Sequence, residues 1–283
     1  MEYGYDSEEE EEDSIWPIKS ETLRPSQRIT VFRKPSRQSL FPFLFGVEVE
    51  VVLIPRESCS TWNEVVDRLS SVLTDLNVPN RIHDADEKPA KYDKWLTTKD
   101  GSIGWRGQQN RWGVELVSPI TTHSTSPRVW GTGFQTVWQG IKDTFGIFEA
   151  PTCGTHLHVS VPMGWSQGLM ALRPVAKAAI YFEECIIDAL MPFERVTNNY
   201  CQSNLYNPLL KSLKVELIFI IIDQALSVSE LARIVCADGQ GSTRRSFRWN
   251  FEPLTDHEKV RKRLATIEFR QPPGCTNAEE LDS

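Results

Sequence analysis

The feature that most constrains the fold is a short apolar segment, residues 41–54, that contains two carboxylates (FPFLFGVEVEVVLI). Its aromatic and β-branched residues, with apolar positions alternating around the acids, predict a β-strand. Glu48 and Glu50 are two positions apart, so their side chains share one face, roughly 7 Å apart. Two carboxylates on a buried face need protons or a cation, because burying an unpaired negative charge is costly. A metal is the simplest such cation, and an edge strand with its acids in water is the alternative.

Composition excludes several classes of protein. The chain has 283 residues, of which 40% are hydrophobic, enough for one large core or two small ones. A net charge of -7 without a basic stripe argues against nucleic acid as the main partner. The six cysteines are widely spaced and form no Cys-x-x-Cys pair, which fits neither a zinc ribbon nor a disulfide scaffold. No leader-like N-terminus or long apolar run occurs, so we expect a cytoplasmic protein with no membrane partner.

Two regions differ in composition. Residues 1–38 begin with an acidic block, Glu8–Asp13, and continue with arginines among prolines and serines. This pattern predicts a disordered acidic tail. Residues 39–283 are expected to form one catalytic domain.

Hydrophobic periodicity and breakers predict the elements that follow the first strand. We expect helices from Thr61 to before Pro79, over 134–145, over 169–191 with a break near Pro174, and over 229–235. Between Trp95 and Trp105 we expect two short strands joined by an Asp100-Gly101 turn, and further strands are expected over 112–120, 153–161 and 265–273. The pair Glu183-Glu184 is expected on a solvated helix face. Residues 209–224 have a helical pattern, yet they are more apolar than a surface helix should be.

The predicted strands each carry polar groups of one chemical kind. Glu115 lies in the second long strand, His156 and His158 share a face of the third, and Glu268 and Arg270 share a face of the last. Carboxylates with an occasional imidazole suit Mg²⁺ or Mn²⁺, whereas zinc more often recruits thiolates or three histidines. An arginine among these acids suits a phosphate group. The set indicates phosphoryl transfer from ATP, although no P-loop or kinase-type glycine loop is present.

At this point the chain resembles a known family, the amidoligase enzymes of the glutamine synthetase and glutamate-cysteine ligase superfamily of carboxylate-amine ligases. The resemblance covers about 225 residues and rests on motifs that occur in the family's order: Phe45-Gly-Val-Glu-Val-Glu50, Asp100-Gly-Ser102, Glu115-Leu-Val-Ser-Pro119, Cys153-Gly-Thr-His-Leu-His-Val-Ser160, Arg195 with Asn199-Tyr200-Cys201, and Thr266-Ile-Glu-Phe-Arg270. Each motif alone is weak, and the ordered set is fairly specific.

The resemblance implies an α+β fold, in which an antiparallel sheet curves into a half-barrel with helices on its outer face, as in the catalytic domain of glutamine synthetase. It implies ATP with Mg²⁺ or Mn²⁺, and a small-molecule or peptide carboxylate that is activated as an acyl phosphate and joined to an amine. By motif, the metal ligands are expected to be Glu48, Glu50, Glu115, His156 and Glu268.

The same resemblance assigns further site residues. His158 is expected near the nucleotide, and Arg270 is expected to steady the transferred phosphoryl group. Substrate or phosphate binding is expected of the remaining site residues: Asp100, Arg195, Asn199 and Tyr200. Asp100 is also a candidate acceptor for the proton that the amine must lose.

Two departures from the family pattern leave alternatives open. Only 13 residues follow Arg270, so the last strand could lack its helical cover, and the apolar residues 215–222 fit no motif. The alternatives to a ligase are a phosphotransferase of the guanidino-kinase type and a catalytically inactive member that binds nucleotide.

Overall fold

The computed structural model describes residues 43–83, 91–122, 127–160, 168–256, 260 and 265–277. The predicted tail, residues 1–38, lies outside this part of the chain. The strands are β1 Leu44–Pro55, β2 Asn80–Ile82, β3 Trp95–Thr98, β4 Trp112–Val117, β5 Thr121–Thr122, β6 Phe145–Phe148, β7 Thr155–Ser160, β8 Trp249–Asn250 and β9 Ile267–Phe269. The α-helices are α1 Trp62–Asp75, α2 Pro127–Thr144, α3 Leu169–Phe182, α4 Asp188–Leu190, α5 Phe193–Val196, α6 Val215–Gln224 and α7 Val228–Val235.

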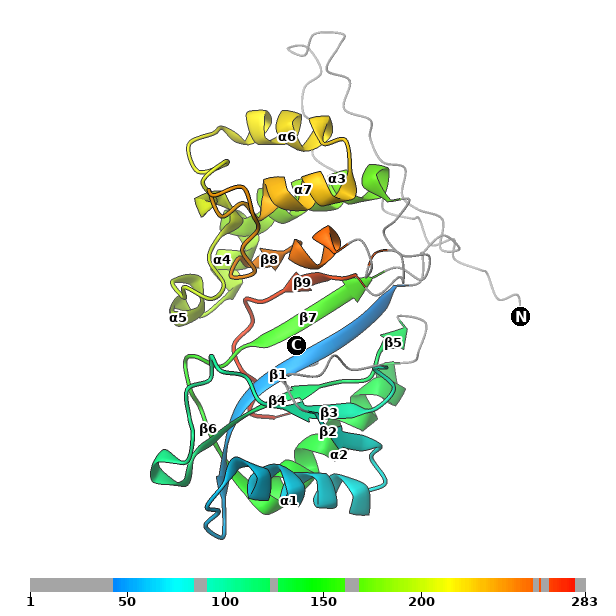
Figure 1. Cartoon of the computed structure of the whole chain (residues 1–283), viewed down its shortest axis with the longest axis vertical. Coiled ribbons are helices and arrows are strands. Elements are labelled where there is room, and N and C mark those ends of the chain that lie inside the picture. Colours follow the sequence, from blue (N-terminus) through cyan, green and yellow to red (C-terminus); the bar gives the residue numbers. More distant parts are fainter. Residues whose placement is uncertain are drawn as a thin grey trace, which may run out of the picture. The chain divides into compact units, whose positions relative to one another are not determined.

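The strands within these residues form one open sheet built around β1 (Figure 1). Its order is β2-β3-β4-β1-β7-β9-β8, with β5 and β6 also paired to β1, and every pair is antiparallel except β2 with β3. One edge of β1 pairs with β4. The opposite edge is divided, because residues 44–49 pair with β7 and residues 52–55 pair with β6. The expectation of an α+β fold with a largely antiparallel sheet is confirmed.

The alternation in β1 separates an apolar face from an acidic face. Val47, Val49 and Val51 are buried in a core cluster that includes residues of α1 and α2. Glu48 and Glu50 lie between these valines, so they point to the other face. In the other half of the sheet, Ile267 of β9 is buried in a second cluster with residues of α3, α6 and α7. Helices therefore cover the sheet face opposite the acids.

Local sequence signals explain where the helices begin. At the start of α1, the Thr61 hydroxyl accepts a hydrogen bond from the backbone N–H of Glu64 (3.2 Å), and the Glu64 carboxylate accepts one from the N–H of Ser60 (2.8 Å). The apolar segment that fitted no motif contains α6. Its Ile218 and Ile222 are fully buried in the second cluster, which accounts for the composition of this segment.

Two expectations about secondary structure were wrong. Asp100-Gly101 does lie in a turn, but the second short strand expected before Trp105 is not formed. The chain there continues irregularly to β4 through Gly104 and Gly107, both at positive φ. The helix over residues 169–191 is not broken at Pro174, which lies inside α3. The carbonyl that loses its hydrogen bond to this proline belongs to Met170, which is 76% exposed and therefore accessible to water. The interruption lies instead at a π-helical turn over Glu183–Ile187.

The expectation for Glu183 was also wrong. Its side chain is fully buried, whereas Glu184 is exposed as expected. The Ser203 hydroxyl (2.6 Å) and the backbone N–H of Asn204 (2.9 Å) donate hydrogen bonds to the Glu183 carboxylate. Burial nevertheless outweighs these bonds and raises the pKa of Glu183 above its ordinary value.

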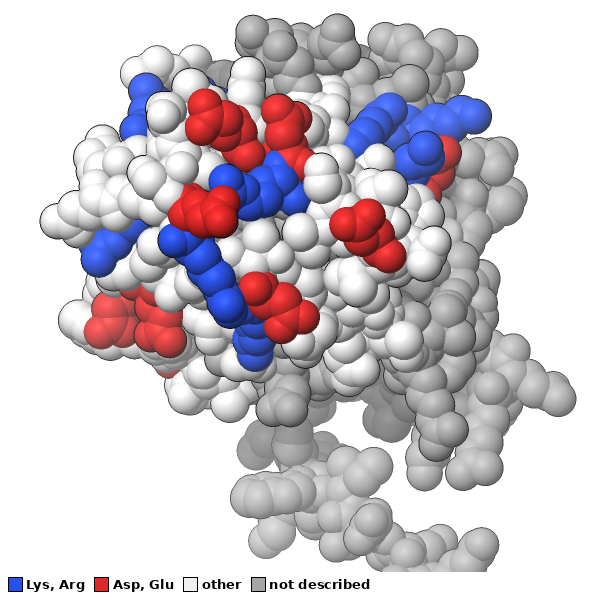
Figure 2. Space-filling view, turned by 90° about the horizontal axis from the view of Figure 1, so that it is seen from below, with Lys and Arg blue, Asp and Glu red and all other residues white. Residues whose placement is uncertain are grey.

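Other global features agree with the composition. None of the described helices is long and apolar enough to cross a membrane. All six cysteines lie in the described part of the chain, and no two of them are joined in a disulfide. Seen from the side of α1, acidic and basic side chains are interspersed, without a large area of one sign (Figure 2).

Candidate metal centre

The strand register brings the acids and imidazoles of four strands onto one face of the sheet. Glu50 of β1 lies opposite Glu115 of β4, and Glu48 lies opposite His156 of β7. The next pair along the sheet is His158 of β7 with Glu268 of β9. Cross-strand partners point to the same face, so segments up to 220 residues apart contribute to one cluster. We call these residues the acid cluster: Glu48, Glu50, Glu115, His156, His158 and Glu268.

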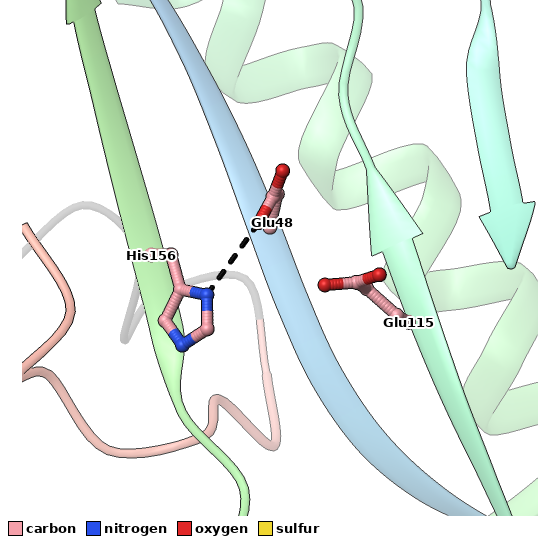
Figure 3. Close-up of side chains that lie close together, drawn as sticks. All are labelled: Glu48, Glu115 and His156. Atoms are coloured by element: carbon pink, nitrogen blue, oxygen red, sulfur yellow. Dashed lines mark ion pairs between the residues drawn. The ribbon is translucent and has the colours of Figure 1, made fainter. Parts of the chain in front are cut away.

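The side chains of the acid cluster lie close together, and Figure 3 shows three of them, Glu48, Glu115 and His156. His156 Nδ1 is 3.5 Å from Glu48 Oε2 and 3.3 Å from Glu268 Oε1. His158 Nε2 is 3.1 Å from Glu48 Oε1. The carboxylate of Glu115 points from β4 toward Glu48.

Three overlapping sets of side chains offer ligand atoms that all lie within 4.8 Å of one another: Glu48, Glu115 and His156; Glu48, His158 and Glu268; and Glu50, Asp100 and Glu115. Opposite ligands of one Mg²⁺ are about 4.2 Å apart, a comparable separation. His156 Nδ1 and His158 Nε2 are buried, and the groups that face them are carboxylate oxygens at 3.1–3.5 Å. Buried imidazole nitrogens that converge with carboxylates are a ligand set for a divalent cation, so the residues present suit the metal that the sequence predicts.

The electrostatics of the acid cluster show what a cation would relieve. Burial raises the pKa of Glu115 well above its ordinary value, and the Glu48 and Asp100 carboxylates add to the rise. Burial also raises the pKa of Glu50. Burial opposes the charging of His158, but the Glu48 and Glu268 carboxylates outweigh it and raise the pKa of His158 to about 9. Burial alone would raise the pKa of Glu48, but the imidazoles of His158 and His156 outweigh it and hold this pKa well below the usual range. The raised pKa values of Glu50, Glu115 and His158 therefore favour proton uptake by the acid cluster when no cation is bound.

Three neighbouring groups fix the orientation of cluster side chains. The backbone N–H of Gly154 donates to Glu50 Oε2 (2.7 Å). Thr266 Oγ1 lies 2.9 Å from His158 Nδ1, which leaves Nε2 facing Glu48. The side-chain amide of Asn250 donates to Glu268 Oε2 (2.6 Å), which leaves Oε1 facing the imidazoles. Such supporting contacts are the ones that commonly orient metal ligands.

Asp100 and Arg270 lie at the acid cluster. A carboxylate oxygen of Asp100 is within reach of Glu50 and Glu115, and its Oδ1 accepts a hydrogen bond from the N–H of Ser102 (2.5 Å). Arg270 pairs through Nη1 with Glu268 Oε1, and its Nε donates to the backbone carbonyl of Tyr200 (3.4 Å).

Arg195, Asn199 and Tyr200 have other surroundings. The buried guanidinium of Arg195 donates to the backbone carbonyls of Gln271 (2.9 Å), Cys153 (3.3 Å) and Arg270 (2.6 Å). Asn199 is exposed and accepts from the Gln202 side chain (3.0 Å). Tyr200 is exposed, and its backbone carbonyl meets Arg270. The structure thus brings Arg195 close behind the acid cluster and places the side chains of the other two at the surface.

Sequence reasoning missed two residues at this site. Asn250 is a buried amide within the aromatic run Phe247-Arg-Trp-Asn-Phe251, and a polar residue in such a run is a signal that could have identified it. Tyr92 lies beside the cluster. Partial burial and the charges of Glu48 and Glu115 raise the pKa of its phenol. Its polar surroundings in the sequence gave no such signal.

Fold and site define an α+β protein with a cluster of carboxylates and imidazoles, able to hold a divalent cation, on one face of an open sheet. The chain matches the model of the family described as "Putative amidoligase enzyme" over residues 42–283, and it belongs to that family. Membership confirms the resemblance seen in the sequence and supports ligase activity. No curated protein and no solved structure matches the chain significantly.

Proposed function

We propose that the protein is an ATP-dependent ligase that joins a carboxylate to an amine through an acyl phosphate, on a sheet related to the catalytic domain of glutamine synthetase. Its metal would be Mg²⁺ or Mn²⁺. The observation that carries the proposal is the convergence of carboxylates and imidazoles from β1, β4, β7 and β9 on one sheet face, at separations that divalent cations can bridge. Family membership gives the reaction class.

Each site residue would have a role set by its position in the acid cluster. Glu48, Glu50, Glu115, His156 and Glu268 would hold the metal ions, with His158 facing the nucleotide. When bound, the metal ions would neutralise the phosphate oxygens of ATP and the charge that develops during transfer. Arg270, already paired with Glu268, would place its remaining donors on the transferred phosphoryl group.

The reaction would take place in two steps, each of which forms one bond and breaks another. A carboxylate oxygen of the first substrate attacks the γ-phosphorus, and the bond from this phosphorus to ADP breaks. The amine nitrogen then attacks the acyl carbon, and phosphate leaves with the electron pair of the carbon–oxygen bond. An ammonium substrate gives up two protons in all, one of which ends on phosphate. Asp100, whose carboxylate lies near those of Glu50 and Glu115, would accept one of them.

An ADP-release assay tests this function. The full chain is incubated with ATP and Mg²⁺, and carboxylates and amines are offered singly and in pairs. A ligase releases ADP and forms an amide only when both substrates are present. Release with a single acceptor and a phosphorylated product would instead indicate a phosphotransferase. ATP binding without release under any pairing would indicate an inactive nucleotide-binding member.

A further inference from the structure

A cavity of about 410 Å³ opens beside the acid cluster, where β1 changes partner from β7 to β6. Its wall includes Glu50, Phe148, Cys153 and residues of the loop after β9. Pockets of about 300–1,000 Å³ are typical of small-molecule sites. Glu50 belongs to both the cavity and the acid cluster, so a ligand in the cavity would lie next to the place proposed for acyl transfer.

The charge of the cavity wall is predominantly negative. Three glutamates line it: Glu50, Glu149 and Glu194. The last two are exposed and form no ion pair with a described residue. Among the described residues that line the wall, the one cation is Arg195, which is buried and uses three of its five N–H donors on backbone carbonyls. Arg111 lies behind Phe148, with its guanidinium carbon 3.8 Å from the ring centre, and is not part of the wall.

The rest of the wall is apolar and chemically inert. Ile147, Phe148 and Pro192 supply hydrocarbon surface. Burial, with a smaller effect of the Glu50 carboxylate, raises the pKa of the Cys153 thiol to about 12. This thiol therefore stays protonated and is no nucleophile. The cavity combines hydrocarbon walls with carboxylates, a combination that suits a ligand with a carbon chain and a positive charge.

We propose that this cavity binds the amine substrate, and that the substrate is a cationic alkylamine that carries no carboxylate, such as an aliphatic diamine. The inference rests on the ligase function proposed above and adds the class of its amine. An ammonium group would pair with Glu149 or Glu194, and the hydrocarbon chain would pack against Phe148. A carboxylate on the substrate would meet the two exposed like charges of Glu149 and Glu194, whereas the described cation of the wall, Arg195, is buried and bonded to backbone carbonyls.

Calorimetry on the full chain, saturated with Mg²⁺, tests the inference with three probes of equal chain length: 1,5-diaminopentane, 5-aminopentanoate and glutarate. We expect 1,5-diaminopentane to bind at least about tenfold more tightly than 5-aminopentanoate, and glutarate not to bind in the cavity. Glu149→Gln and Glu194→Gln should each weaken diamine binding by about threefold, and the double variant by about tenfold. Glu184→Gln, an exposed glutamate outside the cavity, is the matched control and should leave binding unchanged.

Two results would overturn the inference: equal affinity for the diamine and 5-aminopentanoate, or diamine binding that persists in the Glu149→Gln/Glu194→Gln double variant and is lost in Glu48→Ala. The ADP-release assay separates the two proposals. Diamine binding that depends on Glu149 and Glu194, without ADP release from any pair, would refute the ligase and keep the cationic site. Amide formation that favours anionic amines and ignores both substitutions would keep the ligase and refute the site.

Discussion

The side-chain amide of Asn250 donates a 2.6 Å hydrogen bond to Glu268 Oε2, and its own oxygen is held by the N–H of Glu252 (2.9 Å). The second bond fixes which end of the amide faces the carboxylate. Asn250 therefore orients Glu268 so that Oε1 faces His156. This relationship makes Asn250 a positioning residue for the acid cluster.

Asn250→Leu, which keeps the side-chain volume and removes the donor, should lower Mn²⁺ or Mg²⁺ affinity by about tenfold, the size of effect that contacts supporting metal ligands commonly have. Calorimetric titration with each metal measures it. The matched control is Asn63→Leu, an exposed position on α1, which lies on the apolar side of the sheet. Unchanged metal affinity in Asn250→Leu would assign Asn250 to the packing of β8 alone.

Glu48→Ala should abolish ATP-dependent turnover and leave the chain folded. The Glu48 carboxylate contacts both imidazoles and belongs to two of the three candidate ligand sets, so its loss removes the centre of the acid cluster. Glu268 remains next to both imidazoles, 3.3 Å from His156 and 3.8 Å from His158, which limits the effect of the change on stability without metal. ADP release and circular dichroism test the two halves of this prediction. Full turnover in the variant would contradict the site.

Addition of Mg²⁺ should stabilise the metal-free protein. A ligand that binds only the folded state adds about 2.7 kcal/mol at one hundred times its dissociation constant. For a chain of this size the melting temperature should rise by about 5–10 °C. Differential scanning fluorimetry with and without a chelator measures the shift. In Glu115→Gln the shift should shrink, because this variant removes a shared ligand from two sets.

Arg195→Ala and Arg195→Lys should both destabilise the fold. Removing the guanidinium takes the side-chain donor from the backbone carbonyls of Gln271 and Arg270, which costs about 2 kcal/mol or more, and a lysine cannot replace all of these bonds. The Cys153 carbonyl keeps a hydrogen bond from the N–H of Gly274 (3.1 Å). Urea denaturation measures the loss. Native stability combined with lost turnover would instead favour a direct role in substrate binding, as the sequence motif predicts.

Glu183 should give the protein a pH dependence of opposite sign to that of an ion-paired carboxylate. Because its pKa in the folded state is raised, folding binds a proton, and the wild type gains stability as pH falls through that raised pKa toward the unfolded value of about 4.3. Glu183→Gln lacks this titration. The difference in unfolding free energy between the two proteins should therefore shift in favour of the wild type between pH 7 and pH 5. A constant difference across this range would contradict the raised pKa.

Much of the acid cluster could be predicted because strand alternation is a short-range rule. Glu48 and Glu50 are separated by one apolar residue, as are His156 and His158, and each pair necessarily shares a face. The order of motifs along the chain then indicated the family. The register that joins Glu50 to Glu115 could not be predicted, because it is set by pairing between residues 65 positions apart.

The failures have physical causes of a similar kind. Glu183 looks solvated beside Glu184, and only the distant loop with Ser203 and Asn204 makes its burial tolerable. The hydrogen-bond partners of Arg195 could not be predicted, because they are the backbone carbonyls of segments that its own sequence does not specify, and its expected role in substrate binding stays a prediction. The two-residue strand β8 is too short for a periodic signal, so Asn250 was missed.

The divided edge of β1 has a consequence for how relatives of this protein could diverge. The turn over residues 149–154 joins β6 to β7 just where the neighbour of β1 changes, and the cavity lies there. Insertions in this turn would resize the cavity while the paired residues on either side keep their register. If the proposed function holds, relatives could therefore differ in their amine substrate while the acid cluster keeps its residues.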